Sequence, residues 1–133
     1  MKKNVFKLNV SQELLMFTAI GISSHENDYR LSWSLNEHLG LQFVFQSKGH
    51  IAGTEEFACF CHTDETQTLW LISNRCSNGF LLPKYKNFDF ILKFDRKLSE
   101  NDLNSWLQDL KKAPLISALL PLPVERQIFA RLS

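Results

Sequence analysis

The stretch TLWLISNRCSNGFLLPKYKNFDFILKF, residues 68–94, decides the fold of this chain. It contains two apolar runs, residues 69–72 and residues 88–94, on either side of a compact polar loop at residues 73–79. Short apolar runs bounded by Gly, Pro, Asn and Ser are typical of buried β-strands. We therefore predict that this stretch forms the middle of a β-sheet, with the polar loop at one edge.

The flanking sequence predicts more strands joined by short connections, and hence an antiparallel meander. The predicted strands cover residues 5–10, 14–22, 41–46, 56–62, 69–74 and 88–94, with an edge strand at 115–122. Gly21, within the second of these strands, indicates a bulge or a close backbone approach. We predict one α+β domain, residues 1–133, with a mainly antiparallel sheet of about five to seven strands covered by about two or three helices.

Capping patterns place the helix ends. Ser23-x-x-Glu26 has the form of a capping box, and Gly40 stands where a C-terminal glycine belongs. A second helix is predicted to begin at Ser99, and a short terminal helix at Pro123. The second helix has one apolar face, on which truncating Trp106 to Ala would cost about 3–5 kcal/mol; its members are Leu103, Trp106, Leu107 and Leu110.

The first helix has two apolar faces. Its main stripe recurs every four residues, at Leu31, Leu35 and Leu39. Tyr29 and Trp33 lie on a flank, where a helix resting on a sheet does not need them. A partner subunit or a ligand would cover them, or else residues 115–122 or the terminal helix would cover them internally. We predict a homodimer in which the first helix, with Tyr29 and Trp33, or an adjacent sheet edge takes part, because interface cores favour aromatic residues.

Composition excludes several classes of function. The chain has 133 residues, 44% of them hydrophobic and 22% charged, with a formal net charge of +1. This balance provides no general attraction for nucleic acid or for an anionic membrane. The apolar runs are too short to span a bilayer, and three cysteines do not describe a disulfide framework. We expect a cytoplasmic protein with no nucleic-acid or membrane partner.

Two stretches together resemble a known family. Residues 21–41, GISSHENDYRLSWSLNEHLGL, precede residues 71–90, LISNRCSNGFLLPKYKNFDF. Together they resemble the IPExxxVDY family of small uncharacterised bacterial proteins, whose motif reads LPKYKNFDF here. Pro83 and Asp89 match it, whereas Lys84 replaces its glutamate and reverses the charge. The resemblance extends over about residues 5–120 and implies a soluble, single-domain bacterial protein; it does not indicate which activity, cofactor or catalytic residue the protein would have.

The cysteines and histidines do not form a metal pattern. On a strand, Cys59 and Cys61 share one face while His62 points to the other. Structural zinc sites instead have sulfurs converging from a turn. We therefore predict Cys59 and Cys61 to be reduced, buried and metal-free. Cys76, beside Arg75, is a loop thiol unless a base lies next to it in the fold.

The polar loop offers the alternative to a protein-binding function. Asn74, Arg75 and Asn78 could bind a carboxylate or phosphate. Equally, Asn78 and Gly79 could provide positive φ for a turn, with Arg75 paired to an acidic residue of the same chain. No catalytic residue and no cofactor is predicted. The leading hypothesis is a non-enzymatic interaction or structural module that self-associates; the alternative is a small-ligand or anion-binding protein, or a weak enzyme, using residues 74–79.

Overall fold

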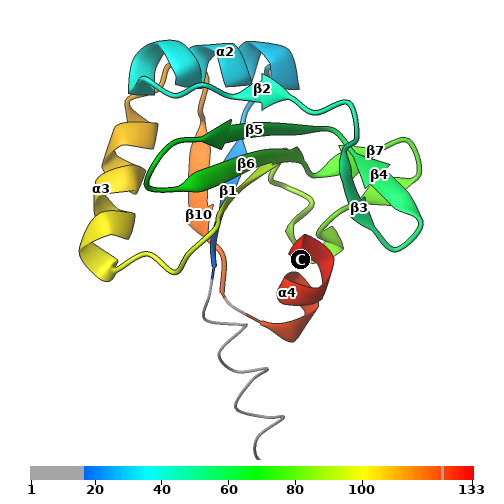
Figure 1. Cartoon of the computed structure of the whole chain (residues 1–133). Coiled ribbons are helices and arrows are strands. Elements are labelled where there is room, and N and C mark those ends of the chain that lie inside the picture. The colour runs from blue at the N-terminus through cyan, green and yellow to red at the C-terminus, as the bar shows by residue number, and fades with distance from the viewer. Residues whose placement is uncertain (1–16, 124) are drawn as a thin grey trace, which may run out of the picture.

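A computed structural model describes residues 17–123 and 125–133, and its centre is one six-stranded antiparallel sheet (Figure 1). The strand order is β10-β1-β9-β6-β5-β2. These strands are β1 (Thr18–Ser23), β2 (Val44–Phe45), β5 (Cys59–Thr63), β6 (Thr68–Ser73), β9 (Phe90–Phe94) and β10 (Ala118–Pro121). The predicted α+β class is confirmed, and β6 and β9 lie at the centre as residues 68–94 predicted. The strand predicted at residues 5–10 lies outside the described residues.

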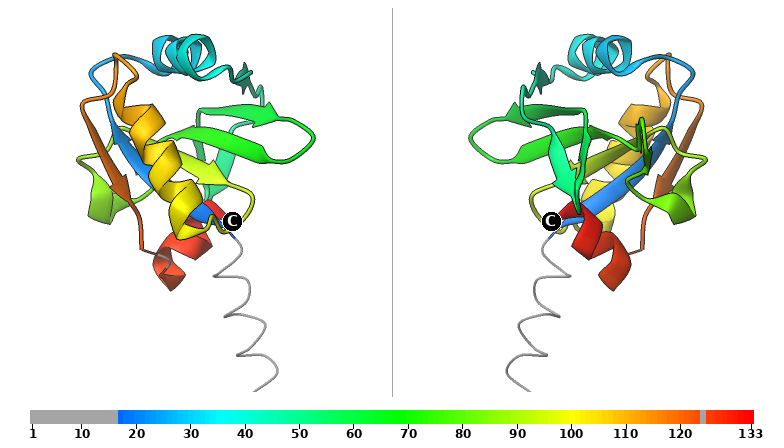
Figure 2. Two further views of the ribbon diagram at one scale, coloured as in Figure 1. Left: turned by 90° about the vertical axis from the view of Figure 1, so that its left-hand side faces the viewer. Right: turned by 90° about the vertical axis from the view of Figure 1, so that its right-hand side faces the viewer.

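The remaining elements cover this sheet. Two hairpins form small sheets of their own: β3 (His50–Ala52) with β4 (Glu55–Phe57), and β7 (Arg75–Cys76) with β8 (Gly79–Phe80). The helices are α2 (Asp28–Leu39), α3 (Glu100–Lys111) and α4 (Arg126–Leu132), with a 3₁₀ turn η1 (Pro83–Tyr85). The two views of Figure 2 show α2 at the top of the molecule and α4 at the bottom.

Strand alternation divides the apolar residues between two cores. On β6, Leu69 and Leu71 point to one face and Ile72 to the other. Helices α2 and α3 cover the first face, where Leu31 and Leu35 are fully buried. Helix α4, the β3–β4 hairpin and η1 cover the second face. The sheet is therefore sandwiched, which is why its strands read as continuous apolar runs.

The predicted start of α2 is wrong. Its N-cap is Asn27, whose side-chain oxygen accepts the Arg30 N–H at 2.9 Å. Ser23 is instead the last residue of β1, and its carbonyl accepts the Ser117 N–H from the neighbouring strand segment at 2.9 Å. Tertiary pairing therefore keeps Ser23 extended and moves the cap four residues on. The predicted glycine end is confirmed, because Gly40 has φ of 66°.

Of the two other predicted helix starts, one is confirmed and one is wrong. Ser99 caps α3 as predicted, and its Oγ accepts the Asp102 N–H at 3.1 Å. Helix α4 begins later than predicted, with Glu125 at its N-cap, so Pro123 is not its first residue. The Glu125 N–H bonds the Pro123 carbonyl at 3.0 Å, which keeps the chain in a turn at that point.

The strand predicted at residues 56–62 is two strands. Glu55–Phe57 folds back on His50–Ala52 around Gly53, whose φ is 63°. The chain then enters β5 at Cys59. This hairpin was not predicted, because Phe57 fits the apolar alternation of β5 while belonging to the small sheet.

Candidate functional site

Asn74 organises the loop of residues 82–89, which we call the motif loop because it contains most of LPKYKNFDF. It is fully buried, between β6 and β7. Its backbone N–H donates to the Asp89 carbonyl at 2.9 Å, and its carbonyl accepts the Leu81 N–H at 2.8 Å. Its side-chain amide bonds the Tyr85 and Phe88 carbonyls at 3.0 and 2.8 Å and the Leu82 N–H at 2.7 Å. These hydrogen bonds to backbone groups of the same chain occupy the side-chain amide. Asn74 therefore fixes the conformation of the loop and is not exposed to a ligand.

The close approach predicted at Gly21 belongs to the same construction. A Cβ at Gly21 would come within 3.0 Å of the Phe88 ring. The Phe88 side chain therefore packs against β1 at a position where any residue other than glycine would displace it. The motif loop is thus held from both sides, by Asn74 and by the bare backbone of β1.

Arg75 and Asn78 do not converge with Asn74 on one point. Arg75 is exposed, with its guanidinium 4.0 Å from the Asp89 carboxylate and 5.5 Å from the centre of the Phe80 ring. Asn78 is exposed at the tip of the β7–β8 turn; of the pair predicted to provide positive φ, Gly79 has it, with φ of 159°, and Asn78 does not. The intrachain pairing predicted for Arg75 is therefore the arrangement observed.

A shallow hollow of about 330 Å³ lies beside Arg75. Its walls carry acidic groups as well as the arginine, and Asp89 accepts the Ser24 N–H at 2.9 Å. Because Asp89 balances the charge of Arg75, the hollow lacks the unpaired cation that an anion site needs.

Tyr29 and Trp33 lie on the same side of the sheet as one exposed residue of β2, Phe45. We call Tyr29, Trp33 and Phe45 the aromatic patch. Their exposed fractions are 60%, 61% and 46%. Val44, the other residue of β2, is also exposed but points to the opposite face of the sheet. The Tyr29 and Phe45 rings stack at 5.8 Å. Sequence patterning identified Tyr29 and Trp33 but did not single out Phe45, because alternation alone does not show that a strand lies at a sheet edge.

Within the described part of the chain, the two segments predicted as possible internal covers do not lie over Tyr29 and Trp33. Strand β10 pairs with β1 at the opposite edge of the sheet, and α4 lies on the opposite face from α2. Residues 115–122 and the terminal helix, which were the two candidates for covering these aromatic residues, therefore pack against other parts of the sheet.

The open edge of β2 is partly closed by a side chain. The Gln46 N–H donates to the Cys59 carbonyl at 2.9 Å, so the peptide groups of Phe43 and Phe45 face away from β5. Asn36 bonds both peptide groups of Phe43, at 2.7 and 3.2 Å. Across the part of the chain that the structure describes, the outward peptide groups of Phe45 have no such side-chain partner.

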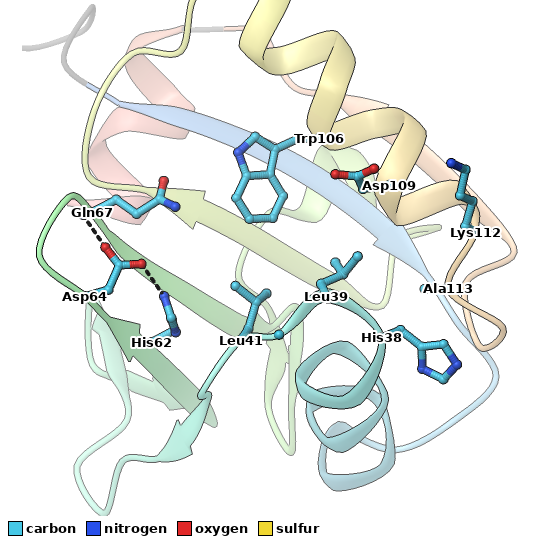
Figure 3. Close-up of a pocket in the computed structure, with 11 residues that line it drawn as sticks. His38, Leu39, Leu41, His62, Asp64, Gln67, Trp106, Asp109, Lys112 and Ala113 are labelled. Carbon is cyan, nitrogen blue, oxygen red and sulfur yellow. Dashed lines mark hydrogen bonds and ion pairs between the residues drawn. The ribbon is translucent and has the colours of Figure 1, made fainter.

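A groove of about 570 Å³ lies between the C-terminal ends of α2 and α3 and the β5–β6 hairpin (Figure 3). Apolar and polar side chains line it: Leu39, Leu41, His62, Asp64, Trp106 and Asp109 are the main ones. Its volume is that of a small-molecule site. Sequence reasoning missed it, because its walls come from three segments far apart in the chain.

The His–Asp pair in this groove is structural. His62 is buried, its Nδ1 accepts the Gln42 N–H at 2.9 Å, and its Nε2 donates to Asp64 at 2.8 Å. These bonds assign the proton to Nε2 and occupy both nitrogens, so the imidazole has no free site for general-base chemistry. The hydrogen bond from His62, with further bonds from Thr66 and Gln67, holds the pKa of Asp64 well below its usual range.

The thiols are separate from one another and from the histidine. Cys59 and Cys61 lie on the face opposite His62, as strand parity predicted, but Cys61 is half-buried and not buried. Burial raises the pKa of Cys59 to about 11. The Cys76 thiol lies 3.1 Å from the Glu55 carboxylate. In residues 17–123 and 125–133, His, Cys, Asp and Glu do not cluster in a group of three that could hold a metal.

Comparison with models of known families and with curated proteins finds no match to this chain. Among the described helices, none has the length and apolar character needed to cross a membrane.

Proposed function

We propose that the protein is a non-enzymatic interaction module of the bacterial cytoplasm that forms a homodimer through the aromatic patch. The observation that carries this proposal is the exposure of Tyr29 and Trp33 on α2 and of Phe45 on the edge strand β2, with the Tyr29 and Phe45 rings in contact. Exposed apolar patches on a domain of this size mark docking surfaces. Aromatic residues are also enriched among the residues that dominate interface energies.

The hydrogen-bonding groups left free at the β2 edge favour pairing with a second copy of this chain over pairing with an extended peptide. A peptide that adds a strand needs a run of free N–H and C=O groups. Asn36 already occupies those of Phe43, so pairing would stop after Phe45. Two copies related by a two-fold axis at Phe45 need only that residue, because each Phe45 N–H meets the partner's Phe45 carbonyl. The patch then supplies the apolar contact around this short pairing.

The opposite edge of the sheet is less suited to pairing. The Leu122 N–H bonds the Ala19 carbonyl at 2.9 Å, so Pro121 falls at an outward position of β10. Proline has no N–H to donate, which is a common protection of sheet edges. Self-association through β2 is therefore the expected mode.

Light scattering coupled to size exclusion, at micromolar concentration, tests the proposal. We expect the mass of a dimer for the wild type and of a monomer for Phe45→Lys. Leu120→Lys is the matched control: it makes the same change from apolar to charged at the other edge of the sheet, and should leave the dimer intact. Circular dichroism establishes that each variant is folded.

Two results would contradict the proposal in different ways. A monomer mass for the wild type overturns self-association. A dimer that persists with unchanged affinity in folded Trp33→Ala and Phe45→Lys variants keeps the dimer but removes the patch from its interface. The alternative ligand site at residues 74–79 is not proposed, because Asn74 and Asp89 are committed within the chain.

A further inference from the structure

We propose that the groove between α2, α3 and the β5–β6 hairpin binds a small organic cation: an amine whose apolar part lies against Trp106. This site is separate from the aromatic patch and does not depend on the homodimer. The inference rests on the shape of the groove, on the side chains that face it, and on the ends of the two helices that border it (Figure 3).

The middle of the groove is an apolar slot. Trp106 points down from α3 toward Leu39 and Leu41, which form the other wall (Figure 3). Its ring meets Phe94 edge to face, with centroids 5.1 Å apart, which fixes the orientation of the indole. Trp106 remains partly exposed although it packs against the core. A fixed, partly exposed indole opposite leucines can take a flat or linear apolar group, and its face attracts a cation.

Both ends of the slot are acidic. Asp64 stands at one end, and its lowered pKa keeps the carboxylate ionised through the neutral range. Asp109 stands at the other end, on α3, and forms no ion pair with any residue that the structure describes. A ligand cation would give Asp109 a partner that the chain itself does not provide.

The two helices add to this negative field. Helix α2 ends at Leu39 and α3 at Lys111, and the residues after both ends line the groove. Helix C-termini carry a partial negative charge that favours cations. The groove thus lies where two such ends and two carboxylates meet.

The basic residues at the rim do not reverse this field. His38 bonds the Ser34 carbonyl through Nδ1 at 3.0 Å, and its ring turns away from Trp106 (Figure 3). Lys112 follows the last residue of α3, where its charge meets the carbonyl end of that helix. The apolar slot therefore faces more acidic than basic groups, and this selects a cation over an anion.

Three probes of equal size test the charge preference: benzylamine, which is a cation at pH 7, benzyl alcohol, which is neutral, and benzoate, which is an anion. Binding is followed by amide and indole shifts in two-dimensional ¹H–¹⁵N NMR. We expect saturable shifts with benzylamine, at the Trp106 indole and the amides of Gln67 and Asp109, and weaker binding of the other two probes. Absence of saturable binding of benzylamine, or equal binding of benzyl alcohol, overturns the proposal.

Variants locate the site. Asp109→Asn should weaken benzylamine binding about threefold, as expected for one partly exposed ion pair, and should leave benzyl alcohol unaffected. Trp106→Leu should weaken both. Asp102→Asn makes the same change about two turns earlier on α3, outside the groove, and should have no effect. If Asp102→Asn weakens binding as much as Asp109→Asn, the effect comes from net charge and the site is not this groove.

Discussion

Asn36 on α2 bonds both outward-facing peptide groups of Phe43: its Oδ1 accepts the N–H at 2.7 Å and its Nδ2 donates to the carbonyl at 3.2 Å. The Asn36 side chain thus provides Phe43 with the two hydrogen bonds that a neighbouring strand would provide. The strand predicted at residues 41–46 is reduced to Val44–Phe45 for a different reason. The Gln42 N–H, which faces β5, donates to Nδ1 of His62 at 2.9 Å and so does not bond a backbone carbonyl of β5.

Asn36→Ala should lower the free energy of unfolding by about 1–3 kcal/mol, because Phe43 is buried and its two peptide groups would lose their partners. Urea denaturation measures this change. Asn36→Asp is the informative companion: it keeps the acceptor for the Phe43 N–H and loses only the donor. A loss as large for Asp as for Ala would mean that the carbonyl bond carries most of the effect.

Asn74→Ala should be among the most destabilising polar substitutions in the chain, at about 3 kcal/mol or more, because it leaves the Tyr85 and Phe88 carbonyls and the Leu82 N–H without partners. Asn78→Ala, at an exposed turn four residues later, is the control and should change stability by less than about 0.5 kcal/mol. Similar losses for the two variants would show that the buried network is not what holds the motif loop.

Phe94→Ala should cost about 3–5 kcal/mol, as large truncations in a core do, because Phe94 is fully buried. Trp106→Ala should cost less, about 2 kcal/mol, because one side of the indole faces the groove and loses little packing there. The sequence alone predicted the larger cost for Trp106. Chemical denaturation of both variants measures the two losses. If Trp106→Ala loses as much stability as Phe94→Ala, the larger cost predicted from the sequence is correct.

Cys59 should be the slowest of the three thiols to react. It is buried and its pKa is raised to about 11, so its thiolate is scarce at pH 8. Mass spectrometry after brief alkylation of the native protein should find Cys61 and Cys76 modified and Cys59 protected until urea is added. Rapid native labelling of Cys59 would show that β5 opens readily.

Asp64 should make stability depend on acid pH. Its pKa is lowered in the folded state, mainly by the bond from His62, so the unfolded chain binds its proton more readily. The stabilisation is therefore complete above the ordinary pKa of 3.8 and is lost as pH falls below it. Asp64→Asn should be destabilising at pH 7, with a difference from wild type that shrinks at pH 3. A difference that stays constant between the two pH values would contradict this assignment.

Local interactions explain which features could be predicted from the residues. Strand parity placed Cys59 and Cys61 opposite His62, and capping chemistry placed Ser99 and Gly40 at helix ends. Each of these depends on neighbours only a few residues away. The exposed flank of α2 at Tyr29 and Trp33 was predictable for the same reason, because helical geometry separates it from the leucine stripe.

The sequence by itself therefore determined the α+β class, the central position of residues 68–94, the face of α2 that packs on the sheet and the aromatic pair left over. The tertiary structure alone decided that β2 is an open edge beside that pair, that Ser23 stays in β1, and that Asn74 is buried and not exposed to a ligand. It also brought Trp106, Asp109 and Asp64 to one groove. The physical reason is the sequence distance between the residues in contact. Contacts between distant segments determine which strands are at the edge of the sheet, which residues are buried and which side chains meet in one groove. The pattern of side chains within one segment does not encode these contacts.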